Sequence, residues 1–499
     1  MSHFSKDGLA PFFPEEMSFS STKTTAVKNT AWVAAWDAKS GTHVYRRDCD
    51  IVFTGDTITF VGKNYGGQAD DIIDGRDLLV MPGFVNIHSH PSTEPGQKGI
   101  REEHGVAAMY MSSLYQRSAV FRLDEAGRQA AAEVAYAEML ASGVTSVADL
   151  SVPFDGWVAL MAKSGLRGFL APGYASSRWA LQSEHELLFE WDEVGGRRGF
   201  ETALALIDEA SRHPSGRLSG VVYPAQIDTC SEELLRDSMA VALDKGLPIT
   251  IHVAQSVPEF NVMIRRHGKT PIQWAHETGL LGPNMTLGHA IFIDEHSWLH
   301  WSTRRDLSLI AQSGASVAHC PTPFARYGQT LEDFGRYLRG GVNLGIGTDC
   351  SPHNIIEEMR TALILARVAG EDIETVRTAD LLHAATVGGA NALLRDDLGR
   401  LAPGCKADMV LVDLRNDGMR PLRDPLRSLI YTAAERAVRD VYIDGAKVVE
   451  GGRVLTLDRA AAVERLEAAQ RRMMAKVPEL DYEGRSAEEI SPPVLPIVD

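Results

Sequence analysis

Residues 83–90 read GFVNIHSH, an apolar, β-prone run that ends in two histidines separated by one serine. Side chains two residues apart lie on the same side of an extended chain. The imidazoles of His88 and His90 can therefore reach one metal ion if the run is a strand whose end opens onto a site. The His-x-His pattern alone also occurs among surface and core histidines, so its meaning depends on the rest of the chain.

Seven further β-prone runs follow, separated by stretches of helical composition. Alternating β and α segments favour parallel strands joined by right-handed helical crossovers. Eight such units between residues 81 and 400 predict an α/β fold with a (β/α)8 barrel, in which catalytic groups lie at the carboxyl ends of the strands. The expected strands cover 83–88, 145–150, 167–171, 220–225, 248–253, 285–292, 315–319 and 342–347.

Short β-prone runs with glycine-rich turns occupy residues 29–80, and the same pattern returns in 406–414 and 438–455. The two ends of the chain are therefore expected to complete one sheet domain. The predicted domains are the N-terminal part of that sheet domain in 1–80, the barrel in 81–400, the C-terminal part of the sheet domain in 401–456, and a helix with an extended tail in 457–499. The helix, over 457–476, is predicted to face solvent.

The composition limits the partners of the chain. Of 499 residues, 50 are Lys or Arg and 66 are Asp or Glu, and the net charge of −16 disfavours nucleic acid as a partner. No apolar run approaches the roughly 20 residues that span a bilayer, and no signal-peptide pattern is present, so we expect a cytoplasmic protein without a membrane partner. Five cysteines without a Cys-x-x-Cys pair fit neither a disulfide framework nor a thiolate zinc site.

Other metal-ligating side chains stand at the predicted strand ends. The fifth run ends in His252, the sixth contains His289, and the eighth is followed by Asp349. Imidazoles and a carboxylate that converge with room for a water form the type of site that a catalytic Zn²⁺ or similar divalent ion requires. We therefore predict that His88, His90, His252 and Asp349 bind a metal ion. His289 either joins them or hydrogen-bonds the reacting water or the substrate.

The motifs GFVNIHSH, HVAQ, GHAIF, VAHCP, GIGTD and GRLAPGCKADMVLVDL together resemble the amidohydrolase superfamily. Within it, the chain is similar to the mononuclear branch that contains triazine hydrolases, S-adenosylhomocysteine deaminases and guanine deaminases. The resemblance implies a distorted (β/α)8 barrel joined to a composite β-sandwich, and a homodimer or homotetramer. It also implies that His88, His90, His252 and Asp349 bind the metal, that Asp349 is the general base, and that His289 orients the water or polarises the substrate.

A single divalent ion is expected, Zn²⁺ first, with Fe²⁺, Co²⁺ or Mn²⁺ as alternatives. The binuclear branch bridges two metals with a carboxylated lysine on strand four, but residues 218–230 contain no lysine. Two divalent ions a few ångströms apart need a bridging anion to offset their repulsion. The sequence supplies no obvious bridge.

The chain departs from its resemblance at Gln255. Ring deaminases of this branch usually carry a glutamate at this position, which passes a proton to a ring nitrogen. An amide forms hydrogen bonds but does not titrate, so Gln255 can orient a substrate and cannot act as an acid or base. This departure leaves hydrolysis of an amide, carbamate or urea as open as deamination of a ring.

Further substrate-binding candidates rest on weaker signals. They are His319, Phe324, Arg326, Tyr110 and Trp179. His319 also fits a hydrogen-bonded core histidine, and the spacing around Tyr110 also fits an amphipathic core helix. Phe324 and Arg326 replace small polar residues of the related motif and suggest a flatter, more apolar small-molecule substrate.

Three functions remain open from the sequence. The first is a metal-dependent hydrolase that uses a metal-activated water to cleave a non-peptide carbon–nitrogen bond of a small molecule. The second is hydrolytic dechlorination, or another displacement, on a triazine-like ring, which differs only in the leaving group. The third is a non-catalytic scaffold of the same fold, against which the complete set of candidate ligands argues.

Overall fold

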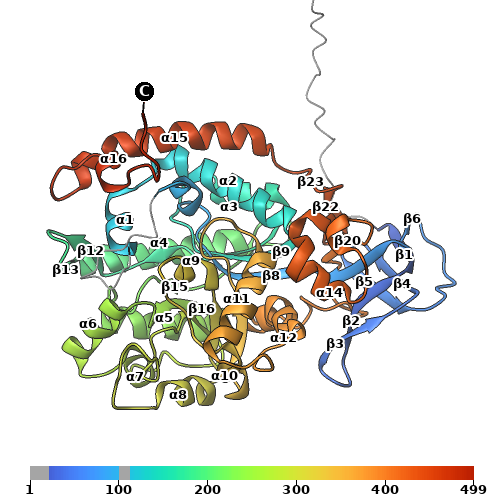
Figure 1. Cartoon of the computed structure of the whole chain (residues 1–499), viewed down its shortest axis with the longest axis horizontal. Helices are drawn as coiled ribbons and strands as arrows, with labels where there is room; N and C mark the ends of the chain where they lie inside the picture. Colours follow the sequence, from blue (N-terminus) through green and yellow to red (C-terminus); the bar gives the residue numbers. More distant parts are fainter. Residues whose placement is uncertain (1–21, 101–112, 499) are drawn as a thin grey trace, which may run out of the picture.

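The computed structural model describes residues 22–100 and 113–498, and Figure 1 shows a barrel region beside a smaller sheet region. The predicted α/β class and its two-part organisation are confirmed. In the barrel, two four-stranded parallel sheets have the orders β14-β10-β9-β8 and β16-β17-β18-β19. The strands are β8 (Phe84–Ser89), β9 (Val144–Asp149), β10 (Arg167–Leu170), β14 (Ser219–Gly220), β16 (Ile249–Val253), β17 (Met285–His289), β18 (Ser316–His319) and β19 (Asn343–Ile346).

The hydrogen-bonded ladder does not run continuously round the barrel. Single bridges between Ser89 and Asp349, Val222 and Ile249, and Gln226 and His252 join the two sheets. The strand predicted over 220–225 consists of two short pieces, β14 and β15 (Tyr223–Pro224), of which β15 pairs with β11 (Gly173–Tyr174). Pro224 has no backbone N–H with which to continue a ladder, which fits this interruption.

The strand predicted over 285–292 is too long at its carboxyl end. The strand β17 stops at His289, because Ala290 has a φ of 51° in the left-handed region and turns the chain out of the sheet. This early stop places His289 at the strand end, where the barrel carries its functional groups.

Helices cover the outside of the barrel (Figure 1). Several begin at a side-chain cap: Asp124, Ser231 and Ser256 each accept a hydrogen bond from a backbone N–H in the first turn. The principal helices are α1 (Leu114–Val120), α2 (Glu125–Ala141), α3 (Trp157–Ser164), α4 (Glu193–Ser211), α5 (Glu232–Lys245), α6 (Val257–His267), α7 (Pro271–Glu277), α8 (Asp306–Ser313), α9 (Pro321–Arg326), α10 (Phe334–Arg339), α11 (Ile355–Ala369) and α12 (Thr378–His383).

The second region is built from both ends of the chain. A four-stranded sheet of order β5-β4-β1-β6 faces a seven-stranded sheet of order β23-β22-β21-β20-β7-β2-β3 across a shared apolar cluster. The strands are β1 (Thr24–Thr30), β2 (Trp32–Asp37), β3 (Thr42–Arg46), β4 (Cys49–Thr54), β5 (Thr57–Gly62), β6 (Asp71–Asp74), β7 (Leu78–Pro82), β20 (Met409–Asp413), β21 (Val438–Ile443), β22 (Ala446–Glu450) and β23 (Arg453–Val454). The predicted boundary between residues 80 and 81 falls inside β7. The predicted domain boundaries stay predictions.

The C-terminal helix α15 (Arg459–Leu480) is longer than predicted and is not simply solvent-facing. Its apolar face, including Leu466, Met473 and Val477, is buried in a cluster with residues of α2. Residues three and four apart share one face of a helix, so an Ala-rich sequence still provides a buried stripe. In Figure 1, α15 lies along the outer side of α2.

A buried ion cluster joins the two regions at the amino end of β10. Arg167, only 1% exposed, donates to both carboxylate oxygens of Asp408 at 3.0 and 3.1 Å and also to Asp444. The backbone N–H of Asp444 donates in turn to Asp408 at 2.8 Å. Every charge in this cluster has an opposite partner within the protein.

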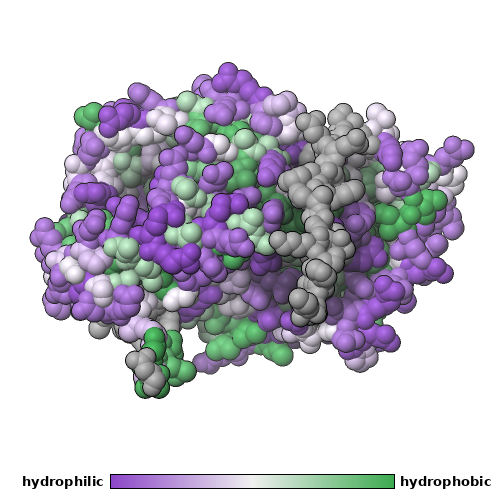
Figure 2. All heavy atoms as spheres, turned by 90° about the horizontal axis from the view of Figure 1, so that it is seen from above, coloured by the Kyte–Doolittle hydropathy of each residue, from purple (hydrophilic) through white to green (hydrophobic). Residues whose placement is uncertain are grey.

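The molecular surface is mainly polar, as the net charge suggests. Figure 2 shows hydrophilic side chains over most of one face, with smaller apolar groups between them. Among the helices of the described ranges, none combines the length and apolar character needed to span a membrane.

Candidate metal centre and cavity

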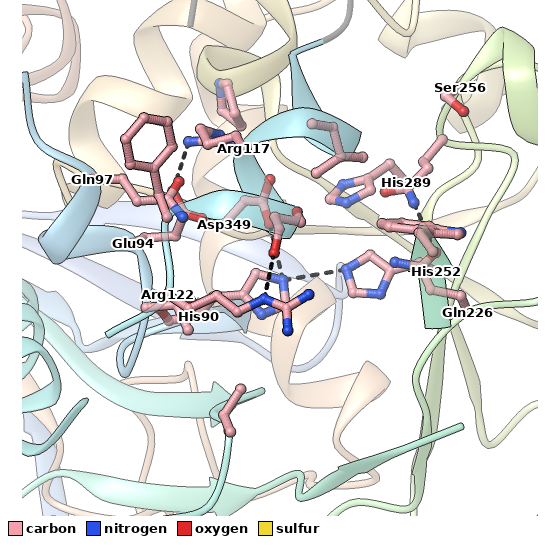
Figure 3. A pocket seen from close by; sticks show the side chains of 18 of the residues that line it. His90, Glu94, Gln97, Arg117, Arg122, Gln226, His252, Ser256, His289 and Asp349 are labelled. Atoms are coloured by element: carbon pink, nitrogen blue, oxygen red, sulfur yellow. Dashed lines mark hydrogen bonds and ion pairs between the residues drawn. The ribbon is translucent and has the colours of Figure 1, made fainter. Parts of the chain in front are cut away.

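Four predicted ligands meet at the carboxyl ends of the barrel strands, and Figure 3 shows three of them, His90, His252 and Asp349. His88, His90, His252 and Asp349 each offer one ligand atom, and these atoms lie within 4.8 Å of one another. The Nε2 atom of His90 is 3.2 Å from Nε2 of His252 and 3.2 Å from Oδ1 of Asp349, and Nε2 of His88 is 3.3 Å from the same oxygen. Strands far apart in the sequence therefore bring one set of donors together.

The backbone fixes the carboxylate between two of the histidines. Asp349 follows β19 with a φ of 56°, in the left-handed region. Its N–H donates to the carbonyl of His88 at 2.9 Å, and its carbonyl accepts from the N–H of His90 at 3.1 Å. The first and last barrel strands are thus joined at the residues that carry the ligands.

Hydrogen bonds to backbone carbonyls orient two of the imidazoles. Nδ1 of His90 donates to the carbonyl of Leu150 at 3.0 Å, and Nδ1 of His252 donates to that of Ala225 at 2.8 Å. A proton held on Nδ1 leaves the lone pair on Nε2, the nitrogen that faces the other ligands.

Electrostatics favour the ligand forms of His252, His289 and Asp349. Burial lowers the pKa of His90, but the Asp349 carboxylate beside it raises that pKa above the usual histidine value, so metal binding there displaces a proton. Burial lowers the pKa of His252 and of His289 well below the usual histidine value, which keeps both rings neutral near pH 7. Burial raises the pKa of the Asp349 carboxyl, but His289, His88 and His90 around it outweigh burial and hold that pKa well below its usual range. Neutral imidazoles and an ionised carboxylate are the states that bind a divalent ion.

The donor chemistry fits one divalent ion. His88 is fully buried, and within the described ranges neither ring nitrogen makes a well-aligned hydrogen bond, although Nε2 lies 3.3 Å from Oδ1 of Asp349. Buried polar atoms are rarely left without a partner in native proteins. Three imidazoles and a carboxylate match the ligand types of a mononuclear zinc site, so the group can hold one metal ion.

A cavity of 370 Å³ opens over these ligands and is lined by His90, His252, His289 and Asp349. His289 is buried and its ring centroid lies 4.5 Å from that of Phe324, which also lines the cavity. Among the described residues, Nδ1 of His289 has no hydrogen-bond partner. His289 therefore stands beside the ligand group with an uncommitted nitrogen.

The other predicted substrate residues are placed unequally. Trp179 lies on β12 (Ser177–Leu181), lines the cavity, and donates through Nε1 to Asp228 at 3.2 Å. His319 is buried and does not line this cavity, and Arg326 lines a neighbouring cavity of 300 Å³. Neither residue contacts the main cavity, so their substrate roles stay predictions. Tyr110 lies outside the described residues.

Gln255 lines the cavity at the end of the fifth strand and is only 3% exposed. Its Nε2 donates to Oε1 of Gln226 at 2.7 Å. Its backbone N–H donates to the carboxylate of Glu259 at 3.1 Å, as does that of Ala254. Gln255 is therefore held by both its backbone and its side chain.

The sequence reasoning missed several cavity residues. Tyr223 and Gln226 come from the fourth strand end, and Arg117 donates to Glu94 at 3.3 Å on another wall, as Figure 3 shows. Gln226 follows the predicted fourth strand directly, so the rule that placed His252 and Asp349 would also have found it. Glu94 and Arg117 lie in connecting segments without a comparable signal.

Comparison with known proteins supports the resemblance to the amidohydrolases. Residues 79–448 match the model of the amidohydrolase family. A 5'-deoxyadenosine deaminase of Methanothermobacter thermautotrophicus is 30% identical over 407 residues, which are 81% of this chain and 89% of that protein. A 5-methylthioadenosine/S-adenosylhomocysteine deaminase of Natronomonas pharaonis is 28% identical, with 84% of this chain and 92% of that protein covered.

Solved structures show the same fold. An adenosine deaminase from Xanthomonas campestris with bound zinc has a TM-score of 0.77 at 23% identity, covering 90% of this chain and 98% of that one. Atrazine chlorohydrolase from Arthrobacter aurescens TC1 complexed with zinc also has a TM-score of 0.77, at 24% identity, covering 89% of this chain and all of that one. Together with the family match over most of its length, these likenesses place the chain in the amidohydrolase family.

Proposed function

We propose that this amidohydrolase is a metal-dependent enzyme that hydrolyses a carbon–nitrogen bond of a small molecule. The observation that carries the proposal is the convergence of three imidazoles and the Asp349 carboxylate beside a cavity of 370 Å³, with His289 next to them. The complete set of donors argues against the non-catalytic scaffold.

The residues at the site divide the proposed chemistry between them. A bound divalent ion lowers the pKa of a coordinated water toward neutrality. Asp349, whose pKa is held low, accepts the proton of the attacking water and passes it to the leaving nitrogen. His289 hydrogen-bonds the substrate atom on which negative charge develops. His88, His90 and His252 hold the metal.

The relatives support deamination of an amino-heterocycle as the first reaction to test, because those quoted above are named as deaminases of adenosine derivatives. This chain differs from the ring deaminases that it resembles, which use a glutamate at this position, because the amide of Gln255 does not titrate. Amides, carbamates and ureas therefore stay in the proposed substrate range.

Displacement on a triazine-like ring is a second candidate. The contact of Phe324 with His289 gives the site a flat apolar wall, and the side chain at position 255 carries no transferable proton. Both features suit a ring whose leaving group departs without protonation by a neighbouring carboxyl.

The test is a panel of amides, ureas, amino-heterocycles and chlorotriazines offered to the purified, metal-loaded protein. Release of ammonia or amine by the wild type and its loss in Asp349→Asn would support carbon–nitrogen hydrolysis. Release of chloride alone would favour displacement. No turnover of any class by a fully metal-loaded protein would oppose both candidates.

A homodimer or homotetramer and a cytoplasmic location are also part of the proposal. The first follows from the family resemblance and the second from the composition. Sedimentation of the purified chain tests the assembly, and fractionation of the source cells tests the location.

A further inference from the structure

The carboxyl ends of the fourth and fifth barrel strands carry a pair of amide side chains, Gln226 and Gln255. Both line the cavity beside His252, and Nε2 of Gln255 donates to Oε1 of Gln226 at 2.7 Å. Figure 3 shows Gln226 next to His252, on the side of the site away from Glu94 and Arg117. Gln255 was predicted to be a catalytic and substrate-binding residue, and Gln226 belongs to neither the metal group nor the predicted site residues.

The backbone holds both amides in place. The N–H of Ile227 donates to the carbonyl of His252 at 3.1 Å, and the N–H of His252 donates to that of Ala225 at 3.1 Å, so Gln226 is tied to the strand that bears a metal ligand. On the other side, the buried Glu259 carboxylate accepts from the backbone N–H groups of Ala254 and Gln255. A rigid pair loses little conformational freedom when it binds a ligand.

The bond between the two amides determines what they offer to the cavity. One N–H of Gln255 is used on Gln226, and the carbonyl oxygen of Gln226 is used in return. Within the described residues, no donor lies on Oε1 of Gln255 and no acceptor lies on Nε2 of Gln226. An amide oxygen only accepts and an amide NH₂ only donates. The pair therefore presents the acceptor oxygen of Gln255 and the donor NH₂ group of Gln226.

We propose that Gln226 is a specificity-determining residue and that the pair binds a substrate edge with an N–H beside a C=O. This inference rests on the proposed carbon–nitrogen hydrolysis. In that reaction the amino group of an amino-heterocycle departs, so the N–H bound by Gln255 must belong to another atom of the substrate. Lactams, cyclic ureas and amino-oxo heterocycles have such an N–H. The adenine ring of adenosine, which is substituted at N9, has none besides its leaving amino group.

Binding of two flat probes tests this recognition without any turnover. Uracil carries the N–H and C=O edge, and 1,3-dimethyluracil has the same ring without an N–H. We expect metal-loaded wild type to bind uracil about ten-fold more tightly than the dimethyl compound, the ratio that one net hydrogen bond provides. Gln226→Leu should weaken the binding of both probes, because both carry the C=O that its amide binds, whereas Gln129→Leu, an exposed change on α2, should change neither affinity.

Metal content and melting temperature are measured for each variant, because Gln226 is bridged to a predicted metal-ligand strand. If Gln226→Leu loses metal or fold, Gln226→Glu replaces it, since a carboxylate keeps the acceptor for Gln255 and loses only the NH₂ donor. Equal affinity of wild type for the two probes, absence of binding, or unchanged affinity of the Gln226 variants for uracil would overturn the inference. Adenosine turned over faster than every amino-oxo heterocycle would also overturn it.

These outcomes are separate from those of the proposed function. A preserved uracil preference without ammonia or amine release from any compound would retain the recognition role and remove the hydrolase proposal. Turnover by a wild type that does not distinguish the two probes would do the reverse.

Discussion

Two clusters of buried polar and charged groups lie at opposite ends of the barrel strands and are satisfied in different ways. At the amino end of β10, Arg167 is paired with Asp408 and Asp444, and the cluster is closed within the protein. At the carboxyl ends, both nitrogens of His88 and Nδ1 of His289 make no well-aligned hydrogen bond among the described residues. His88 and His289 are about as buried as Arg167, so burial alone does not distinguish the two clusters.

The difference lies in what the protein leaves for a ligand. A buried charge without a partner is costly, and a closed ion cluster such as that of Arg167 meets this cost internally. In the proposed function, a metal ion bound by Nε2 of His88 supplies a partner that the protein itself leaves out. The first cluster is closed within the protein and is structural, and a functional role for the second is part of the proposed function.

Removal of the metal should have the largest effect. Dialysis against a chelator should abolish turnover, and one equivalent of Zn²⁺ per chain should restore it, because the site has one set of ligands. His252→Ala should lose most of both metal and activity while the barrel still folds. Elemental analysis and circular dichroism give the two readouts. Two tightly bound ions per chain, or full metal content in His252→Ala, would contradict the single site.

Asp349→Asn should be the next most severe change. The amide keeps the shape of the side chain but cannot accept the proton of water, so turnover should fall by roughly 10² to 10⁴. Steady-state kinetics on metal-loaded protein give the size of the loss, and metal content shows whether binding is also affected. Turnover within a few-fold of wild type at full metal content would require another base.

Arg167→Met should affect stability instead of chemistry. Removal of the cation leaves Asp408 and Asp444 buried and unpaired, and the free energy of unfolding should fall by about 3–5 kcal/mol. Urea unfolding provides the measurement. The matched control is the triple change Arg167→Met, Asp408→Asn and Asp444→Asn, which should cost less than the single change because no lone charge remains. If Arg167→Met lost as much metal as His252→Ala, the proposal that only the second cluster binds a metal ion would be contradicted.

The sequence contained enough to predict the barrel and the ligand group. Strand-end motifs identified His88, His90, His252 and Asp349, because a parallel barrel brings the carboxyl ends of its strands to one side. Local pattern also located most strands. It overextended the sixth, because the left-handed backbone at Ala290 leaves no clear mark in the composition.

Contacts between side chains far apart in the chain could not be predicted from the sequence. The bond between Gln226 and Gln255 and the contacts of Glu259 depend on the relative placement of two strand ends, which periodicity does not report. The prediction that helix α15 faces solvent was wrong for a similar reason. The helix is polar on average, and its composition does not show that α2 covers the Ala-rich stripe along one face. Individual strand ends were therefore easier to predict than the contacts between them.

Gln255→Glu should produce the smallest change and bears most directly on the reaction. The carboxylate loses the N–H that binds Gln226, and the two side chains can rejoin only if Gln226 turns its amide to donate. That turn withdraws the donor from the substrate and brings a negative charge nearer to Asp349. We expect kcat/KM for the preferred substrate to fall about ten-fold, the size of one lost hydrogen bond. If the chain is instead a ring deaminase that works poorly without a glutamate, the same variant should release ammonia from an amino-heterocycle faster than wild type. Parallel assays of both proteins on adenosine and on an amino-oxo heterocycle separate the two cases, and a clear gain on the preferred substrate would show that position 255 needs a titrating group.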